Sequence, residues 1–230
     1  NDLEDLNGIF LNKCNECGFQ YIPNNNQYLE KNYYSNYSRR EDSTTDKRNE
    51  LRREQYRIDA KFLSKYISQN SRILDVGCSA GHFLFEISNC YNLESLMGID
   101  IDSSAIIKAK SKYSEVIFKN IDLLKINSND SFDLILFRGT FQYLGEELQK
   151  SITHLKKLLS KNGKIIIFSL PSSDSLIYKL LGDKWSLFNP EMPLIFNEKS
   201  LRFLCEQNSL TIDDLSYPYL EDIYSNIEED

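Results

Sequence analysis

Short apolar runs alternate with amphipathic stretches along most of the chain after residue 70. Runs of four residues rich in Ile, Leu, Val and Phe are typical of strands buried on both faces, and apolar positions three or four apart are typical of helices. The predicted strands are 73–76, 96–99, 116–119, 134–137 and 165–168, and the predicted helices are 82–90, 103–112 and 146–159. The alternation predicts an α/β fold with a Rossmann-like, doubly wound, mostly parallel sheet flanked by helices.

The segments on either side of this pattern are less regular. Residues 1–45 are predicted to be irregular, and residues 46–69 to form a helix with apolar positions three, four or seven apart. Asn162-Gly163 predicts a C-terminal cap for the helix before it. Residues 171–197 hold three prolines and several aromatic residues, which predicts a lid or a substrate wall. The last predicted elements are a helix at 200–207 and a strand at 210–213.

Composition narrows the class of partner. The 230 residues carry a formal net charge of −7, whereas proteins that bind nucleic acid without sequence preference are usually basic. The charge therefore favours a small or neutral substrate over nucleic acid. No apolar run is long enough to cross a bilayer and no signal-peptide pattern opens the chain, so no membrane partner is expected. Five cysteines, an odd number, do not suggest a disulfide framework, and we expect a cytoplasmic location.

A glycine-rich loop follows the first predicted strand. Residues 75–81 read D-V-G-C-S-A-G and lead directly into a predicted helix. A dinucleotide-binding loop has the spacing G-x-G-x-x-G, which seats a pyrophosphate on the helix N-terminus. Here the spacing is G-x-x-x-G, and Asp75 stands just before the turn, where its carboxylate would repel a pyrophosphate. The same carboxylate would attract the ammonium and sulfonium groups of S-adenosylmethionine (SAM), so the loop favours SAM.

Acidic residues also follow the next two predicted strands. Asp100 stands nineteen residues after Gly81, where a carboxylate can accept hydrogen bonds from both ribose hydroxyls. Ile101 could pack on the adenine ring, and Asp122 could accept a hydrogen bond from the adenine amino group. Each aspartate taken alone could instead cap the helix after it. Three such residues at successive strand ends, after a glycine loop, favour a cofactor site.

Five segments together make the chain resemble the class I SAM-dependent methyltransferase superfamily, over about residues 71–213. They are ILDVGCSAGHF at 73–83, MGIDID at 97–102, NIDL at 120–123, FDLILFRGTFQYL at 132–144 and LLSKNGK at 158–164. The resemblance implies SAM as the cofactor. The residues expected at the cofactor are Asp75, Gly77, Cys78, Ser79, Gly81, His82, Asp100, Ile101, Asp122, Leu123, Phe137, Arg138 and Gly139. His82 is expected to hold the methionine carboxylate, and residues 137–139 to contribute their backbone.

Within the superfamily the chain resembles the branch that acts on sugars and other small metabolites, in which a cysteine knuckle precedes the methyltransferase domain. Cys14 and Cys17 resemble the second half of such a zinc knuckle. A tetrahedral zinc site needs four ligands, and no second C-x-x-C is present, so no metal is expected. The other cysteines are predicted to lie in the core. We therefore expect an N-terminal accessory segment at 1–45 and a methyltransferase domain at 46–230 with a lid-like insertion at 171–197.

The catalytic residues are less clear from the sequence. Many relatives carry His or Glu-His where this chain has Gln142-Tyr143. Tyr143 is the best catalytic candidate, with Gln142 beside it, because methyl transfer depends on positioning and on deprotonation of the nucleophile. The alternative is that Tyr143 is a pocket wall. His154 lies off the apolar stripe of its helix and is expected to be a solvated surface residue.

The expected function is methyl transfer from SAM to a small molecule, such as a hydroxyl of a sugar or another metabolite. Two alternatives stay open, namely a methyltransferase for RNA bases and a SAM-fold interaction module without activity. The basic residues between 47 and 57 are interspersed with Glu50 and Glu54, which predicts a solvated, ion-paired helix. Their functional alternative is a phosphate clamp for a nucleotide-sugar or RNA acceptor. Trp185 and Phe188 are expected to anchor the lid by packing.

Overall fold

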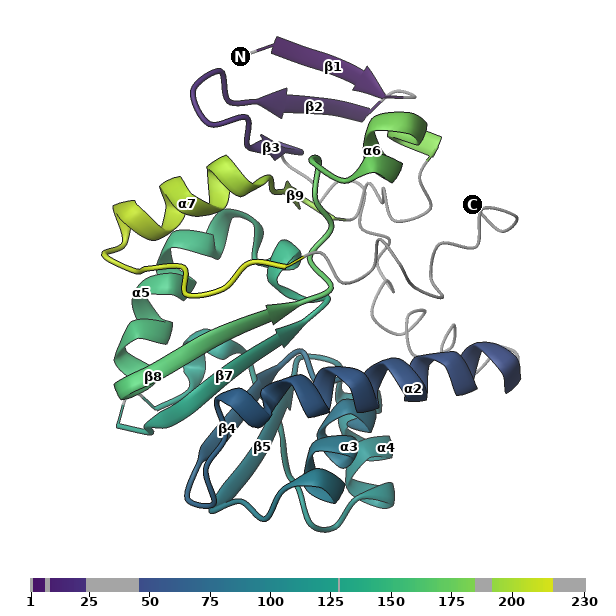
Figure 1. Ribbon diagram of the computed structural model, residues 1–230, viewed down its shortest axis with the longest axis vertical. Coiled ribbons are helices and arrows are strands. Elements are labelled where there is room, and N and C mark those ends of the chain that lie inside the picture. Colours follow the sequence, from purple (N-terminus) through teal and green to yellow (C-terminus); the bar gives the residue numbers. More distant parts are fainter. Residues whose placement is uncertain (1, 7–8, 24–45, 128, 185–191, 217–230) are drawn as a thin grey trace. The chain divides into compact units, whose positions relative to one another are not determined.

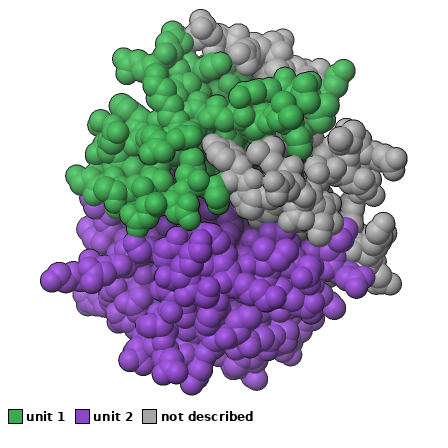
Figure 2. Space-filling model, viewed as in Figure 1, with its two compact units in different colours: residues 1–30, 142–146, 170–230 green, residues 31–141, 147–169 purple. Residues whose placement is uncertain are grey.

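The computed structural model describes residues 2–6, 9–23, 46–127, 129–184 and 192–216. The chain divides into two compact units (Figure 2). Unit 1 comprises Asn1–Glu30, Gln142–Glu146 and Leu170–Asp230, and unit 2 comprises Lys31–Phe141 and Glu147–Ser169. Unit 1 is therefore assembled from three separate stretches of sequence, whereas unit 2 is nearly continuous.

Unit 2 is built on a five-stranded parallel sheet. Its strands are β4 (Arg72–Val76), β5 (Ser95–Asp100), β6 (Ile117–Asn120), β7 (Phe132–Arg138) and β8 (Leu159–Phe168). They lie in the order β6-β5-β4-β7-β8, and every pair is parallel. The order runs outward in both directions from β4, which makes the carboxyl end of β4 the switch point where open α/β sheets bind ligands. The α/β prediction is confirmed.

Helices cover both faces of this sheet. They are α2 (Asp46–Phe62), α3 (His82–Cys90), α4 (Ser103–Lys112) and α5 (Leu148–Leu158), with short 3-10 turns η2 (Leu63–Lys65), η3 (Leu123–Lys125), η4 (Phe141–Tyr143) and η5 (Gly145–Glu147). Ala60, Leu84 and Ile106 from α2, α3 and α4 share one core with Ile73 and Leu134 of the sheet. Figure 1 shows α5 on the other side of β7 and β8 from these three helices.

Most predicted boundaries hold to within two residues, and 82–90 and 103–112 agree in full. The first helix is an exception, because it ends at Phe62 and η2 follows, whereas the sequence predicted a helix to residue 69. Ser68 and Ser71 explain the early end. The Ser68 N–H donates to Ser71 Oγ at 2.9 Å, and the Ser71 N–H donates to the Ser68 carbonyl at 3.0 Å. These local bonds compete with the helical pattern.

The predicted cap at Asn162-Gly163 is wrong. Helix α5 already ends at Leu158, and Leu159 adopts an extended conformation (φ −76°, ψ 136°) that begins β8. Gly163 is not among the glycines with positive φ. It is a glycine for steric reasons, since a Cβ there would lie 2.9 Å from the carbonyl oxygen of Phe132. The register between β7 and β8 shifts near Phe132, and the lack of space at this shift, rather than a left-handed helix cap, explains why residue 163 is glycine.

Unit 1 contains a second, antiparallel sheet in the order β1-β2-β3-β9. Its strands are β1 (Asp2–Leu6), β2 (Ile9–Lys13), β3 (Gln20–Tyr21) and β9 (Leu194–Ile195), with α6 (Leu176–Leu181), η6 (Gly182–Lys184) and α7 (Glu198–Gln207). The prediction that residues 1–45 are irregular is therefore wrong for three short strands. Leu11, Ile22, Met192 and Ile195 form a small core against Tyr178.

The 171–197 segment contributes β9 and α6 to this second unit. Gln20 pairs with Ile195, and the Tyr178 hydroxyl donates to Gln20 Oε1 at 2.8 Å. Trp185 and Phe188 lie outside the described residues, and the lid role of 171–197 stays a prediction. The described part thus belongs with the N-terminal strands.

The predicted strand at 210–213 does not form. The Leu210 N–H donates to the Cys205 carbonyl at 2.8 Å, which ends α7, and no strand of the described residues pairs with the segment that follows. Thr211 and Asp213 are exposed and Leu210 is only half-buried, so the segment has no buried face to hold it in a sheet.

Among the described residues, no helix combines the length and apolarity needed to span a membrane.

Candidate cofactor site

The loop after β4 is held by its neighbours in unit 2. The N–H groups of Gly77 and Cys78 both donate to the carbonyl of Ile99, at 2.9 and 3.0 Å. Gly77 has φ +77°, and a Cβ there would lie 2.3 Å from Cγ2 of Thr140, whose hydroxyl donates to the Val76 carbonyl at 2.7 Å. Both the conformation and the space therefore require glycine.

The loop ends at Gly81, the residue before α3. Gly81 has φ +80°, and a Cβ there would lie 2.5 Å from Cζ of Phe118. Ser79 also has a positive φ of 47°, and Cys78 is buried beneath it. The loop therefore approaches the sheet closely and turns its backbone toward the carboxyl ends of the strands.

Asp75 is the most unusual residue of the site. It is 2% exposed, and its Oδ1 is buried and accepts no hydrogen bond within the described residues. Burial raises its pKa from 3.8 to about 7, the Arg138 guanidinium lowers the pKa, and Asp100 raises it again. A buried carboxylate without a partner is unfavourable, so this position gains from a cationic ligand.

Asp100 connects the end of β5 to the glycine loop. Its Oδ2 accepts from the Ser79 N–H at 2.9 Å, and its Oδ1 accepts from the Asp102 N–H at 2.8 Å. Burial raises the pKa of Asp100, although these N–H donors oppose the shift. Ile101 beside it is 49% exposed, an apolar surface next to a carboxylate. A ribose and a ring together would match this pair of residues.

Asp122 is an exposed helix cap. Its Oδ1 accepts from the Leu124 N–H at 2.8 Å and so begins η3. The capping alternative is thus what the structure shows, and an additional bond to adenine stays a prediction. Leu123, the other residue expected here, is buried beneath it.

Arg138 lies at the carboxyl end of β7 and is held by α2. Its Nε donates to Asp59 Oδ2 at 2.9 Å, its guanidinium lies 4.3 Å from the centre of the Tyr56 ring, and Gln55 Nε2 donates to Asp59 Oδ1 at 2.8 Å. Asp59 and Gln55 are buried. Sequence reasoning missed this ion pair, although the i, i+4 spacing of two polar residues on the apolar side of the helix was a signal.

Gly139 follows with φ +67°, and its N–H donates to the Phe168 carbonyl at 3.0 Å. No atom lies within 4 Å of the place where its Cβ would be. We predict that Gly139→Ala lowers the free energy of unfolding by only about 1 kcal/mol, the strain of a left-handed alanine. Urea denaturation measures this, and a loss above about 3 kcal/mol would show that a side chain is blocked there.

His82, the first residue of α3, pairs with Tyr113. Its Nδ1 lies 2.7 Å from the Tyr113 hydroxyl. Burial lowers the pKa of His82, and Lys112, Arg53 and Arg52 lower it further. A neutral imidazole is therefore expected at pH 7. Tyr113 was not a sequence candidate, because its position one residue after α4 carries no motif.

Comparison with known proteins shows the family to which the chain belongs. The model of a family described as methyltransferase domain matches residues 67–205. The chain belongs to this methyltransferase family. Its fold is that of the class I SAM-dependent methyltransferases.

Two curated relatives show how much of the chain is shared. The putative methyltransferase 235L of Invertebrate iridescent virus 6 is 30% identical over 139 residues, which cover 58% of this chain and 52% of 235L. The malonyl-[acyl-carrier protein] O-methyltransferase of Bacillus cytotoxicus is 34% identical over 100 residues, covering 43% of this chain and 34% of the relative. The chain thus spans about half of the first relative's length and about a third of the second's.

Two solved structures share the fold. The magnesium protoporphyrin IX methyltransferase (ChlM) from Synechocystis PCC 6803, with bound SAH, has a TM-score of 0.64 at 17% identity and covers 83% of this chain and 92% of its own. The plantazolicin methyltransferase BpumL, in complex with a monoazolic desmethylPZN analog and SAH, has a TM-score of 0.55 at 22% identity, over 76% and 68%. At these identities the likeness concerns the fold alone.

The catalytic candidates belong to the other unit of this methyltransferase-family chain. Gln142 and Tyr143 lie in η4 and are grouped with unit 1, whereas the cofactor candidates are in unit 2. Gln142 is buried, and Tyr143 is 36% exposed. Their catalytic role stays a prediction.

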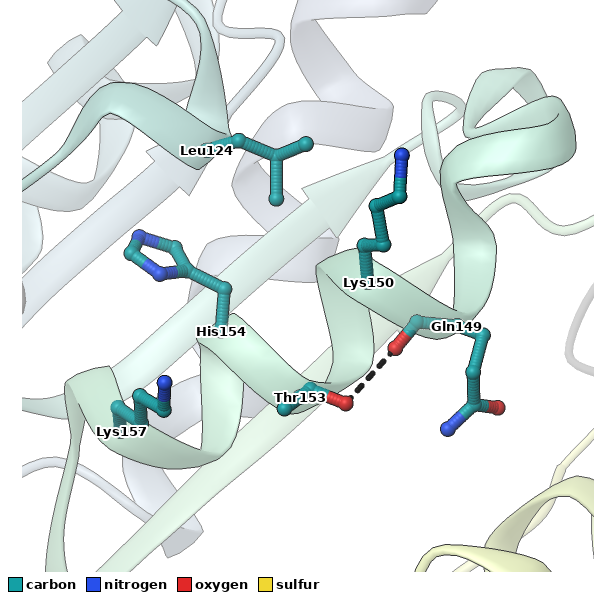
Figure 3. A pocket seen from close by; sticks show the side chains of 6 residues that line it. All are labelled: Leu124, Gln149, Lys150, Thr153, His154 and Lys157. Carbon is teal, nitrogen blue, oxygen red and sulfur yellow. Dashed lines mark hydrogen bonds between the residues drawn. The ribbon is translucent and has the colours of Figure 1, made fainter.

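A groove of about 310 Å³ lies on α5, lined by Leu124, Gln149, Lys150, Thr153, His154 and Lys157 (Figure 3). No lining residue carries a carboxylate to hold a ribose, so this groove does not suit the cofactor. His154 was predicted to be solvated, but it is half-buried and its Nε2 is shielded from solvent without a hydrogen-bond partner.

The cysteines are all free. In the turn from Cys14 to Gly18, the Gly18 N–H donates to the Cys14 carbonyl at 2.8 Å. Nearby N–H groups lower the pKa of Cys14, and burial raises the pKa of Cys17. Over the ranges that the structure describes, no three His, Cys, Asp or Glu residues gather as a metal site. The prediction of a core position holds for Cys78, but Cys205 is only half-buried, and Cys90, the last residue of α3, is exposed.

Proposed function

We propose that this chain binds SAM at the carboxyl ends of β4, β5 and β6 and transfers its methyl group to a hydroxyl of a sugar or another small metabolite. One observation carries the cofactor part, namely the buried Asp75 Oδ1 that lacks a partner beside a loop built for close approach. The ammonium of SAM would supply that partner. The acceptor class rests on the family resemblance and on the acidic charge of the chain.

The proposed binding roles follow the geometry. Gly77 and Gly81 let the loop approach the cofactor, with Cys78 and Ser79 between them, and Asp100 accepts from the ribose hydroxyls. Ile101 offers its exposed side chain to the adenine ring. The other proposed contacts are Asp122 and Leu123 around the adenine, the backbone of Phe137, Arg138 and Gly139, and His82 at the methionine carboxylate.

SAM supplies an electrophilic methyl group that is displaced in line by the acceptor. The chain's task is to hold the reactants in that line and to exclude water, since alignment accounts for much of the barrier. The proposed catalytic residues are Tyr143 and Gln142. The Tyr143 hydroxyl would orient the acceptor hydroxyl or accept its proton, and Gln142 would support that position.

The direct test is calorimetric titration of the chain with SAM and with S-adenosylhomocysteine, followed by transfer of labelled methyl groups to a panel of sugars and other hydroxyl compounds. We expect saturable binding of both cofactors at one site and methylation within the panel. Absence of S-adenosylhomocysteine binding would overturn the cofactor proposal. Binding with methylation of only amines, carboxylates or RNA would overturn the hydroxyl acceptor.

For Tyr143→Phe we predict a fall in kcat of about 10- to 100-fold, because a group that orients or deprotonates the acceptor acts in the chemical step. The dissociation constant of S-adenosylhomocysteine should stay within twofold of the wild type. Tyr91→Phe is a matched control, since it removes a tyrosine hydroxyl that donates to the Ala60 carbonyl and has no part in the proposed site. An unchanged kcat for Tyr143→Phe would make Tyr143 a pocket wall.

A further inference from the structure

The arginines of α2 whose side chains the structure describes fall into two groups. Arg57 is neutralised, with its Nη1 3.2 Å from Glu54 Oε2 and its Nε 3.5 Å from Glu86 Oε2. Arg52 and Arg53 make no ion pair or hydrogen bond within the described residues, and Glu50 pairs with neither of them. Within the described residues, the ion-paired part of the prediction therefore holds for Arg57 and not for Arg52 and Arg53, whereas Arg53 is exposed as predicted.

The register of α2 on α3 shows where these two arginines lie. The Tyr56 ring packs 6.1 Å from the Phe83 ring, Arg57 reaches Glu86, and the Tyr91 hydroxyl donates to the Ala60 carbonyl at 3.0 Å. The two helices thus run in the same direction. One turn before Tyr56 on α2 corresponds to the end of the glycine loop and the first residue of α3, because each residue advances both helices by about 1.5 Å. Arg52 and Arg53 therefore lie beside His82.

The end of α4 reaches the same place. The 2.7 Å contact between His82 Nδ1 and the Tyr113 hydroxyl brings the last turn of α4, with Lys112, next to the start of α3. The pKa of His82 is lowered by Lys112, Arg53 and Arg52 after burial, as expected if all three cations face it. Among the described residues, the acidic groups that raise the pKa of Tyr113 in this cluster are Glu86, which is engaged by Arg57, and Glu115.

This cluster is unusual in a chain with a net charge of −7. Lys112 also offsets the dipole of α4 at its C-terminus, but Arg52 and Arg53 lie within α2 and have no such role. The methionine end of SAM carries one carboxylate, which one cation and the first N–H groups of α3 can neutralise. The remaining charge calls for a second anion, and a phosphate monoester carries about −1.5 to −2 at pH 7. Arginine also matches phosphate oxygens in bidentate geometry.

We propose that the cluster of Arg52, Arg53 and Lys112 binds a phosphate group of the methyl acceptor beside the cofactor loop, in addition to the methionine carboxylate of SAM. The proposal rests on the proposed function, and it names the acceptor as a phosphorylated small molecule with a free hydroxyl. The phosphate group anchors the acceptor and takes no part in the transfer itself.

The test uses the full chain saturated with S-adenosylhomocysteine and titrated with inorganic phosphate and pyrophosphate at low and moderate salt. The Arg52→Gln/Arg53→Gln variant should weaken both affinities at least tenfold. Lys61→Gln/Lys110→Gln is the matched control, because it removes two exposed cations from the same two helices. It should leave both affinities within twofold, and S-adenosylhomocysteine affinity should stay within threefold in both variants.

The acceptor panel adds a second readout. Phosphorylated hydroxyl compounds should exceed their dephosphorylated forms at least tenfold in kcat/KM, and the preference should vanish in Arg52→Gln/Arg53→Gln. Equal weakening by the control variant, or no phosphate binding while S-adenosylhomocysteine still binds, would overturn this inference and leave the proposed function intact. If single-stranded RNA bound these residues more tightly than phosphate and pyrophosphate, the proposal of a small phosphorylated acceptor would be overturned. Loss of S-adenosylhomocysteine binding by the wild type would instead overturn the proposed function.

Discussion

Asp75→Asn should stabilise the fold and at the same time remove most of its affinity for the cofactor. At pH 8 we expect a melting temperature about 5 °C above the wild type, because 1 kcal/mol shifts Tm by about 2–4 °C in a chain of this size. The substitution removes a buried charge whose Oδ1 has no partner. S-adenosylhomocysteine should bind about 100-fold more weakly, since the charged partner of its ammonium is gone.

The stability difference between Asp75→Asn and the wild type should depend on pH. The pKa of Asp75 is raised in the folded chain, from 3.8 to about 7, so the folded chain binds the proton more tightly than the unfolded chain. Stability from this group is present below pH about 4 and is lost as the pH rises to about 7. The stability gain of Asp75→Asn should therefore vanish near pH 4.

The affinity for S-adenosylhomocysteine should depend on pH in the opposite direction to stability, because the ammonium of the ligand needs the ionised carboxylate of Asp75. Wild-type affinity should rise by up to tenfold per pH unit until about pH 7 and then level off. Calorimetry from pH 5 to pH 9 measures it. A wild-type affinity that is flat across this range, or an Asp75→Asn variant that binds normally, would remove Asp75 from the ammonium site.

For Asp100→Ala we predict a loss of about 1000-fold in affinity for S-adenosylhomocysteine. Two charge-assisted bonds to the ribose hydroxyls contribute about 1.5–3 kcal/mol each. The same substitution leaves the N–H groups of Ser79 and Asp102 without their acceptor, so the glycine loop also loses its support. Isothermal titration measures the loss.

Asp102→Ala is the matched control for Asp100→Ala. Asp102 lies two residues away, and its carboxylate caps α4 by accepting from the Ser104 N–H at 2.8 Å. Its removal should lower stability by about 1 kcal/mol and leave cofactor affinity within threefold. Similar losses of affinity in the two variants would mean that the loop region tolerates no change, and the specific role of Asp100 would be withdrawn.

The elements of unit 2 were predictable because their signals are local. The central strands β4, β5 and β7 are buried over most of their length, so their sequences are mostly apolar. Asp102 and Gly81 fix the starts of α4 and α3 by capping and by positive φ. These signals need no knowledge of distant residues. The glycine loop and Asp100 were found for the same reason, since both stand at ends of such strands.

The features that sequence reasoning missed depend on distant partners. The ion pair of Arg138 with Asp59 joins residues 79 apart. β3 has only two residues, Gln20 and Tyr21, and it lies between β2 and the strand β9, which is distant in the sequence. In contrast, 210–213 has a suitable sequence and no partner among the described residues. The cation cluster at His82 depends on the register of three helices, which no single-element pattern encodes.

The discontinuity of unit 1 sets an order for its assembly during synthesis. Unit 2 needs little more than residues 46–169, so its core is complete when that stretch has left the ribosome. β3 emerges early but must wait for β9, at Leu194–Ile195, before its outer edge is paired. Such long-range pairing is slow, because a large loop must close before any contact forms. The chain therefore completes the parallel sheet of unit 2 first, and the second sheet closes only after β9 has been synthesised.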